Sequence, residues 1–232
     1  MSKVIGLIGA MDEEVAVIKS WMSDVRKESI AGCDFFIGQF EGKDVVLLQS
    51  GIGKVNAALS TTLLLSKFSP EYVINIGSAG GFAEELNVGD VVISDHVVHH
   101  DVDVTAFGYP MGQVPSMPAT YEADAALIKQ AQTAVQDVNR VKAKVGLIGT
   151  GDSFMNDPVR VETVRALFPE MVAAEMEAAA VAQVCFKFGT PFVVVRSLSD
   201  IAGKESPQSF EEYLKVAAEN SSLMIQQMLK NG

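Results

Sequence analysis

The sequence predicts an α/β protein built as a three-layer sandwich, in which helices flank both faces of a mixed central sheet. Continuous apolar runs alternate with segments of helical spacing along the 232 residues, and such strands are typical of a sheet covered on both faces. Residues 33–50 form two apolar runs around a Glu41–Gly42 turn, so at least one pair of strands is antiparallel. Because no repeat or linker interrupts this pattern, we expect a single domain over residues 1–232.

The first 70 residues give clear local signals. The apolar run of residues 3–10 predicts a strand, and residues 11–22 have helical spacing with acids in the first turn, where the helix dipole favours them. After the hairpin, residues 54–68 read as a helix that Pro70 closes off.

The middle of the chain alternates in the same way. Apolar runs predict strands over residues 72–77, 88–95 and 143–150, and residues 122–136 have helical spacing. The glycine-rich segment after residue 77 is expected to be flexible. Residues 99–120 contain several prolines and glycines, so we expect a long irregular loop there, of a kind that is usually functional or interfacial.

The last third of the chain completes the sandwich. Pro158 begins a short helix that ends at residue 168, and Gly189 ends a helix that begins at residue 177. The very apolar run of residues 191–200 predicts a buried strand, and residues 209–230 form the last helix.

Composition and charge exclude several functional classes. The formal net charge of −11 repels phosphate backbones and anionic lipids, which argues against nucleic-acid and membrane partners. No apolar stretch reaches the ~20 residues that a membrane helix needs, and no secretory leader is recognisable. Since Cys33 and Cys185 are the only cysteines and no CxxC motif occurs, we expect reduced, structural thiols and a cytoplasmic protein.

Small and polar residues gather where the predicted strands end. In open α/β sheets, ligands bind beyond the carboxyl ends of the strands, so we expect these segments to line one cleft. Turn chemistry explains any one of them, but it does not explain six placed alike. The segments are GAMDEE, SGIGK, GSAGG, GTGDSFM, EME and SLSD.

Known nucleotide and metal motifs do not fit these segments. GLIGAMDEE lacks the G-x-G-x-x-G spacing of a dinucleotide fingerprint, and SGIGKV has Val55 where a P-loop requires Ser or Thr. His96, His99 and His100 would form a metal site only if a loop folded them together. On one strand, His96 and His100 would lie about 13 Å apart. We therefore expect no metal site.

Arginine is scarce in the predicted cleft. None of the five arginines lies between residues 27 and 139, a range that includes two of the six segments. A site that binds phosphate usually offers arginine forks or a dedicated lysine. Carboxylates, serines and glycines instead suit a neutral polar ligand and a water molecule.

Glu14 and Asp200 are the candidate catalytic acids. Glu14 lies in the first turn after the first strand, and Asp200 ends the apolar run of residues 191–200, where burial favours its protonated form. One acid and one base that face each other across a cleft are the minimum for hydrolysis of a glycosidic bond. The alternatives are a dipole-stabilising acid for Glu14 and a helix cap for Asp200.

Eight motifs follow one another between residues 8 and 200, within a resemblance that runs from residue 4 to about residue 225: IGAMDEEV, SGIGKVNAA, INIGSAGG, VGDVVISD, DVTAFGY, GDSFMN, AAEMEAAAVA and VVVRSLSD. In this order and spacing they resemble the bacterial 5′-methylthioadenosine/S-adenosylhomocysteine nucleosidases of the purine nucleoside phosphorylase superfamily. The resemblance implies the nucleoside phosphorylase α/β sandwich. It also implies a hydrolase that acts in methionine salvage, needs no metal or organic cofactor, and releases adenine from methylthioadenosine, S-adenosylhomocysteine and 5′-deoxyadenosine.

The resemblance also implies a role for each residue of the cleft. Glu14 is the base that activates water, and Asp200 protonates adenine at N7 so that the base leaves neutral. Glu177 accepts both ribose hydroxyls in a forked geometry. Ser78, Glu175 and Arg196 help to hold the water. The other substrate-binding residues implied are Phe154 stacked on adenine, Met155 at its edge, Met176 along the sugar, Gly80 and Ser199 nearby, and Met11, Ile52, Val104, Phe107 and Phe210 around the 5′-alkylthio group.

Residues 102–118 indicate self-association. This segment carries Phe107, Tyr109, Met111, Val114 and Met117 despite its prolines and glycines, and so many apolar groups on one loop suggest an interface. The resemblance implies a homodimer in which the loop, through Tyr109 and Pro115, closes the alkylthio pocket of the neighbouring subunit.

Two other functions stay open. A phosphorolytic purine nucleoside phosphorylase has the same fold but needs a phosphate clamp, which the missing arginines argue against. A non-catalytic nucleoside-binding protein has no reason to keep Glu14 and Asp200 together.

Overall fold

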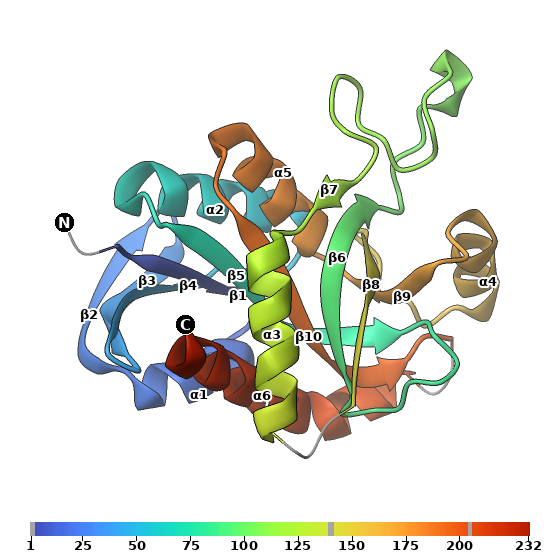
Figure 1. Cartoon of the computed structure of the whole chain (residues 1–232). Coiled ribbons are helices and arrows are strands. Elements are labelled where there is room, and N and C mark those ends of the chain that lie inside the picture. The colour runs from blue at the N-terminus through green and yellow to red at the C-terminus, as the bar shows by residue number, and fades with distance from the viewer. Residues whose placement is uncertain (1–2, 139–141, 204–205) are drawn as a thin grey trace.

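The expected α/β sandwich is confirmed by the computed structural model, which describes residues 3–138, 142–203 and 206–232 (Figure 1). Ten strands form one mixed sheet in the order β10-β6-β8-β9-β5-β1-β4-β3-β2, with β7 paired to β6. The strands are β1 (Ile5–Gly9), β2 (Ser23–Ile30), β3 (Cys33–Phe40), β4 (Lys43–Gln49), β5 (Tyr72–Gly81), β6 (Val91–His99), β7 (Tyr121–Glu122), β8 (Ala143–Thr150), β9 (Met171–Glu175) and β10 (Phe192–Ile201).

Helices cover both faces of this sheet. On one face, α1, α3 and α6 pack over a core that includes Ile74, Ile76 and Val193. On the other face, α2 and α5 pack over Val73 and Val194, because neighbouring residues of a strand point to opposite sides. The helices are α1 (Asp12–Trp21), α2 (Lys54–Phe68), α3 (Ala125–Val138), α4 (Pro158–Leu167), α5 (Ala178–Phe188) and α6 (Ser206–Asn231).

One half of the sheet closes on itself. β10 pairs with β6 and also with β5, so that β5, β10, β6, β8 and β9 form a ring. Register shifts interrupt three of these pairings, between Leu198 and Asp200, between Ser94 and Val97, and between Leu147 and Ile148. Such irregularities bend strands locally, which allows this closure. The sequence pattern predicted a covered mixed sheet but not this ring.

Three strands differ clearly from the sequence prediction, and the two-residue strand β7 was also not predicted. β2 was missed because it is an edge strand with a mostly exposed, polar sequence, and β9 was missed because MVAAE is short and rich in alanine. β5 continues through the glycine-rich segment that was expected to be flexible. Its last residues pair with β10 on one edge and with β9 on the other, and this pairing fixes them.

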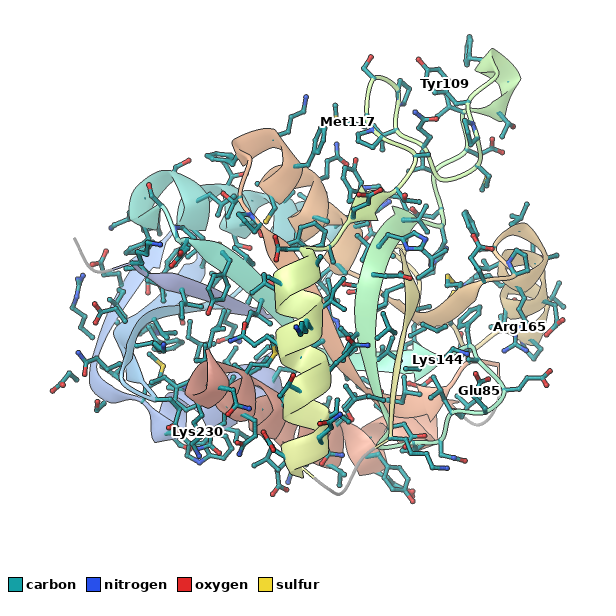
Figure 2. The ribbon with its side chains drawn as sticks, in the orientation of Figure 1. Glu85, Tyr109, Met117, Lys144, Arg165 and Lys230 are labelled. Carbon is teal, nitrogen blue, oxygen red and sulfur yellow. The ribbon has the colours of Figure 1, made fainter. Side chains whose placement is uncertain are left out.

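The expected long loop is present between β6 and β7. It projects from the body of the molecule and contains the short 3₁₀ helix η1 (Thr105–Phe107) (Figure 1). Figure 2 shows Tyr109 and Met117 on this projecting loop. Throughout the described part of the chain, no helix has the length and apolar character needed to cross a membrane.

Candidate active site

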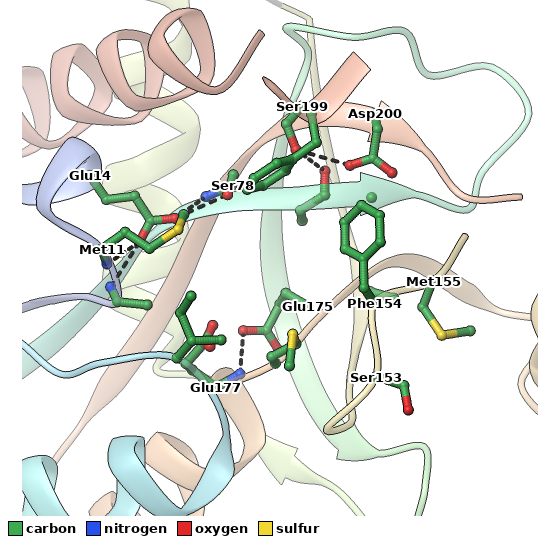
Figure 3. A pocket seen from close by; sticks show the side chains of 17 residues that line it. Met11, Glu14, Ser78, Ser153, Phe154, Met155, Glu175, Glu177, Ser199 and Asp200 are labelled. Atoms are coloured by element: carbon green, nitrogen blue, oxygen red, sulfur yellow. Dashed lines mark hydrogen bonds between the residues drawn. The ribbon is translucent and has the colours of Figure 1, made fainter. Parts of the chain in front are cut away.

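All six polar segments at the strand ends supply residues to one cavity of about 240 Å³ (Figure 3). They meet because β1, β4, β5 and β10 are parallel neighbours, whose carboxyl ends lie at one edge of the sheet. The end of β9 reaches the same place by pairing antiparallel with β5. The cavity is lined by Ala10, Met11, Glu14, Ile52, Ser78, Ala79, Gly80, Ser153, Phe154, Met155, Ala174, Glu175, Met176, Glu177, Ser199, Asp200 and Phe210.

Glu14 is held at the N-terminus of α1 by four hydrogen bonds. Its Oε2 accepts the backbone N–H groups of Ala10 (2.7 Å) and Met11 (3.2 Å). Its Oε1 accepts the backbone N–H (2.9 Å) and the hydroxyl (3.0 Å) of Ser78. The dipole-stabilising interpretation and the pocket interpretation therefore both fit, since Glu14 lies in the first turn of α1 and also lines the cavity.

Gly77 lets two charged groups approach the same point. A Cβ atom at this position would lie 2.4 Å from Nη1 of Arg196 and 2.5 Å from Oε1 of Glu14, and the residue has a φ of +141°. Both facts require glycine here. Sequence reasoning gave Gly77 no role, although it begins the GSAGG segment.

Arg196 lies behind the cavity and does not line it. Its guanidinium is fully buried and donates to Oε2 of Glu175, to Oδ1 of Asn75 (2.8 Å) and to the carbonyl of Ile76 (3.1 Å). Burial by itself would lower the pKa of Arg196, but the carboxylates of Glu175, Glu177 and Glu14 outweigh that effect and raise it. Arg196 is therefore a fixed positive charge that acts on the cavity mainly through Glu175.

The EME segment carries two acids because a strand ends and a helix begins within it. Glu175 is the last residue of β9, and its Oε2 accepts the backbone N–H groups of Glu177 (2.9 Å) and Ala178 (2.8 Å) at the start of α5. Its Oε1 accepts the hydroxyl of Thr150. Glu175 thus caps α5, as an acid at a helix N-terminus does, and leaves Glu177 facing the cavity.

Glu177 is the N-cap residue of α5, and its side chain is nearly buried. Its Oε1 accepts the backbone N–H of Gly53 (2.8 Å), and its Oε2 lies 3.5 Å from Nη2 of Arg196. Burial, together with the nearby charge of Glu175, raises the pKa of Glu177 to about 8, although Arg196 and the Gly53 N–H act in the opposite direction. The free cavity therefore shifts Glu177 toward its protonated form.

Asp200 lies within β10 and is 2% exposed. Its interpretation as a helix cap stays a prediction, because residues 204 and 205, which lead into α6, lie outside the described residues. The register shift after Leu198 places Asp200 opposite Gly80, where a Cβ atom would lie 3.2 Å from Oδ2 of Asp200. The hydroxyl of Ser199 donates to Oδ1 of Asp200 (3.0 Å). In Figure 3, Asp200 lies beside Phe154 and away from Glu14.

Two residues expected in the cavity are not there. Val104 and Phe107 lie on the projecting loop, outside the cavity of their own chain, and Phe107 is 80% exposed. The sequence expectation was wrong for a single chain because the loop leads away from the strand ends that form the cavity. The other residues expected around the alkylthio group, Met11, Ile52 and Phe210, do line it.

The histidines make separate contacts. Nδ1 of His96 lies 2.5 Å from Oδ1 of Asp95, and Nε2 of His99 pairs with Oε1 of Gln183 at 3.0 Å. Burial lowers the pKa of both His99 and His100. Among residues 3–138, 142–203 and 206–232, no three His, Cys, Asp or Glu side chains are grouped as a metal ion would require.

Residues 4–230 match the model of the phosphorylase superfamily, the class of protein that this sheet and its strand-end cavity define. A 5′-methylthioadenosine/S-adenosylhomocysteine nucleosidase of Marinomonas sp. (strain MWYL1) is 85% identical over 227 residues, which are 98% of each chain. This chain therefore belongs to the 5′-methylthioadenosine/S-adenosylhomocysteine nucleosidase family, and the resemblance of its eight motifs is confirmed.

Solved structures of this family are similar over nearly the whole chain. The nucleosidase from Neisseria meningitidis in complex with methylthio-immucillin-A has a TM-score of 0.97 at 44% identity, covering 99% of this chain and 100% of that chain. The nucleosidase from Colwellia psychrerythraea 34H in complex with adenine has a TM-score of 0.96 at 52% identity, covering 99% of this chain and 95% of that chain.

Glu177 gives the stability of the protein a pH dependence. Its pKa in the folded state, about 8, lies above the ordinary value of 4.5, so protonation of Glu177 stabilises the folded state. This stabilisation is complete below about pH 4.5 and is lost as the pH rises through 8. We expect the difference in Tm between the wild type and Glu177→Gln to decrease as the pH rises from about 5 to about 9, because glutamine does not titrate. A thermal-unfolding series checks this, and a constant difference would contradict it.

Proposed function

We propose that this chain hydrolyses the N-glycosidic bond of 5′-methylthioadenosine and S-adenosylhomocysteine, and also of 5′-deoxyadenosine, and that it serves methionine salvage. The products are adenine and the corresponding ribose derivative. One observation carries the proposal: the buried carboxyl groups of Glu14 and Asp200 line the same cavity, each fixed by hydrogen bonds from neighbouring residues. Membership of the nucleosidase family supports the same reaction.

The reaction needs one proton donor and one proton acceptor. Asp200 donates its proton to N7 of adenine, and the electron pair of the C1′–N9 bond leaves with the base. The oxygen of water bonds to C1′, and its proton passes to Glu14. All four acceptor positions of Glu14 are already occupied, so the water must replace one donor. The hydroxyl of Ser78 is that donor, since an O–H rotates more freely than a backbone N–H.

The charge of the cavity suits the transition state. As the glycosidic bond stretches, C1′ gains oxocarbenium character, and the carboxyl groups of Glu14, Glu175 and Glu177 surround the sugar position with a single buried guanidinium behind them. Two ribose hydroxyls that donate to Glu177 favour its carboxylate form, so binding of the nucleoside releases the proton of Glu177 to solvent.

The base position is formed by Phe154 and Met155. The ring of Phe154 meets that of Phe210 edge-on, with centroids 5.7 Å apart, which leaves a face for adenine. The carbonyl of Met155 accepts the N–H of Gly203 at 3.0 Å and keeps a second lone pair, so both backbone groups of Met155 can meet the adenine edge.

Phosphorolysis is the alternative on this fold, and the cavity argues against it. The described residues that line it include neither lysine nor arginine, which a phosphate site usually offers. We therefore expect adenine to be released from methylthioadenosine at the same rate in phosphate-free and phosphate buffer, as measured by chromatography. A rate that requires phosphate would favour a phosphorylase, and uncleaved nucleoside bound after long incubation would favour a binding protein.

The two carboxyl groups can be tested separately. Asp200→Asn keeps the shape but cannot deliver a proton, and Glu14→Gln keeps the shape but cannot accept one. We expect each to lower kcat by roughly 10²- to 10⁴-fold in adenine-release assays without changing the circular dichroism spectrum. Glu13→Gln, on the exposed neighbour of Glu14, is the matched control and should keep full activity. If either variant retained most of the wild-type activity, the role of that residue would be refuted.

We also propose that the protein is a homodimer, one domain per chain, in the cytoplasm. Strands from residue 5 to residue 201 join one sheet, which supports a single domain. Both cysteines are free and buried, which suits a reducing compartment. The base of the projecting loop and helices α2 and α5 form an apolar groove lined by Val55, Val102, Val114, Val184 and Phe188, and such a surface is typical of an interface.

In this dimer, Phe107 and Val104 reach the alkylthio pocket of the partner subunit. We expect Phe107→Glu and Tyr109→Glu to dissociate the dimer at micromolar concentration and to raise KM for methylthioadenosine together, as measured by sedimentation and parallel kinetics. Met111 is a less clean target because it packs against a cluster in its own chain. Val159→Glu, equally exposed but on α4, should change neither property. A fully active monomer would refute this role of the loop.

A further inference from the structure

The N-terminus of α2 is capped by carboxylates from distant parts of the chain. Helix α2 has Gly53 as its N-cap residue and no acid in its first turn. Instead, Oε1 of Glu177 accepts the N–H of Gly53 (2.8 Å), and Oδ1 of Asp152 accepts the N–H of Lys54 (2.8 Å). The first two backbone donors of this helix are therefore satisfied by one residue of the cavity and one residue outside its lining.

Asp152 is itself held in place. Its backbone N–H donates to Oδ2 of Asp101 (3.1 Å), while Oδ1 of Asp101 accepts Nζ of Lys54 (2.6 Å). The pKa of Asp101 is lowered: burial opposes this, but Lys54 and the N–H of Asp152 outweigh burial. Gly53 makes the close approach possible, because it has a φ of +93° and a Cβ there would lie 3.1 Å from Oδ1 of Asp152.

These hydrogen bonds join two segments that form different parts of the cavity. Gly53 N–H fixes one carboxyl oxygen of Glu177, and Asp152 directly precedes Ser153, Phe154 and Met155. Asp101 lies two residues after the end of β6, at the start of the projecting loop. Its carboxylate accepts hydrogen bonds from Asp152 and from Lys54, and so holds both segments near the end of this strand. A displacement of Asp152 would therefore move the start of α2 and the Phe154 segment together.

We propose that Asp152 is a positioning residue that aligns the ribose-hydroxyl acceptor Glu177 with the adenine-stacking Phe154. This inference rests on the proposed roles of Glu177 and Phe154. Asp152 touches neither the reacting bond nor the proton donor and acceptor. Its effect is on selectivity for the sugar, because a misaligned Glu177 no longer distinguishes a hydroxyl from its absence.

The test compares methylthioadenosine with its 3′-deoxy analogue. In Asp152→Ala we expect the ratio of their kcat/KM values to fall about tenfold from that of the wild type, with the loss mainly in KM for methylthioadenosine. Asp152→Asn keeps an acceptor for the Lys54 N–H and should restore most of the ratio. The matched control is Asp157→Ala, since Asp157 caps its own helix α4 by accepting the N–H of Val159 (2.9 Å).

A merely structural role predicts a different result. Asp152→Ala and Asp157→Ala each remove a helix-capping carboxylate and should lower Tm by similar amounts, but only Asp152→Ala should change the ratio. Equal ratios in both variants and the wild type would overturn the proposal. If Asp152→Ala does not fold, Asp152→Glu misplaces the acceptor by one methylene and should show a smaller loss, and an unchanged ratio there would overturn it as well. A wild type that releases no adenine, or that cleaves both nucleosides equally, would refute the proposed function or the role of Glu177 instead.

Discussion

The buried ion pair between Arg196 and Glu175 joins the strands that form the active site. Arg196 comes from β10 and also bonds to Asn75 and Ile76 of β5, while Glu175 comes from β9 and also bonds to Thr150 of β8. A charge removed from water needs an opposite charge beside it, and loss of one partner of such a pair typically costs about 3–5 kcal/mol. The ring of strands and the start of α5 therefore depend on one guanidinium.

This constraint also sets the electrostatics of the cavity. With Arg196 committed to Glu175, the other acids share little positive charge, and burial together with the charge of Glu175 raises the pKa of Glu177. Buried carboxyl groups that share little positive charge are costly in the ground state. They become favourable when the sugar gains positive charge. In an N-glycosidase, the same shortage of cations that disfavours phosphate binding would thus stabilise the oxocarbenium ion.

Much of this architecture could be predicted from the sequence, because parallel strands bring distant strand ends to one edge. That rule is enough to place Glu14, Ser78 and Asp200 in one cleft, where the structure also has them. It does not place Glu177, which follows β9, a strand that pairs antiparallel with β5. It could not place Gly53 beside Glu177 or Asp152 beside Lys54, contacts that span 124 and 98 residues and depend on helix packing. The prediction that the glycine-rich segment after residue 77 is flexible was wrong for a related reason. Its strand conformation comes from pairing on both edges and not from local preference.

The incorporation of Gly80 and Gly81 into β5 divides the cavity into a rigid part and a variable part. Backbone paired on both edges cannot adapt to the size of a ligand, so this part of the cavity surface is rigid. The walls proposed to surround the 5′ substituent include Ile52 in a turn and Phe210 near the start of α6. Variation in those walls can alter which 5′ substituent is accepted while the bond-breaking geometry stays unchanged. The fold is thereby open to new substrates without a new reaction.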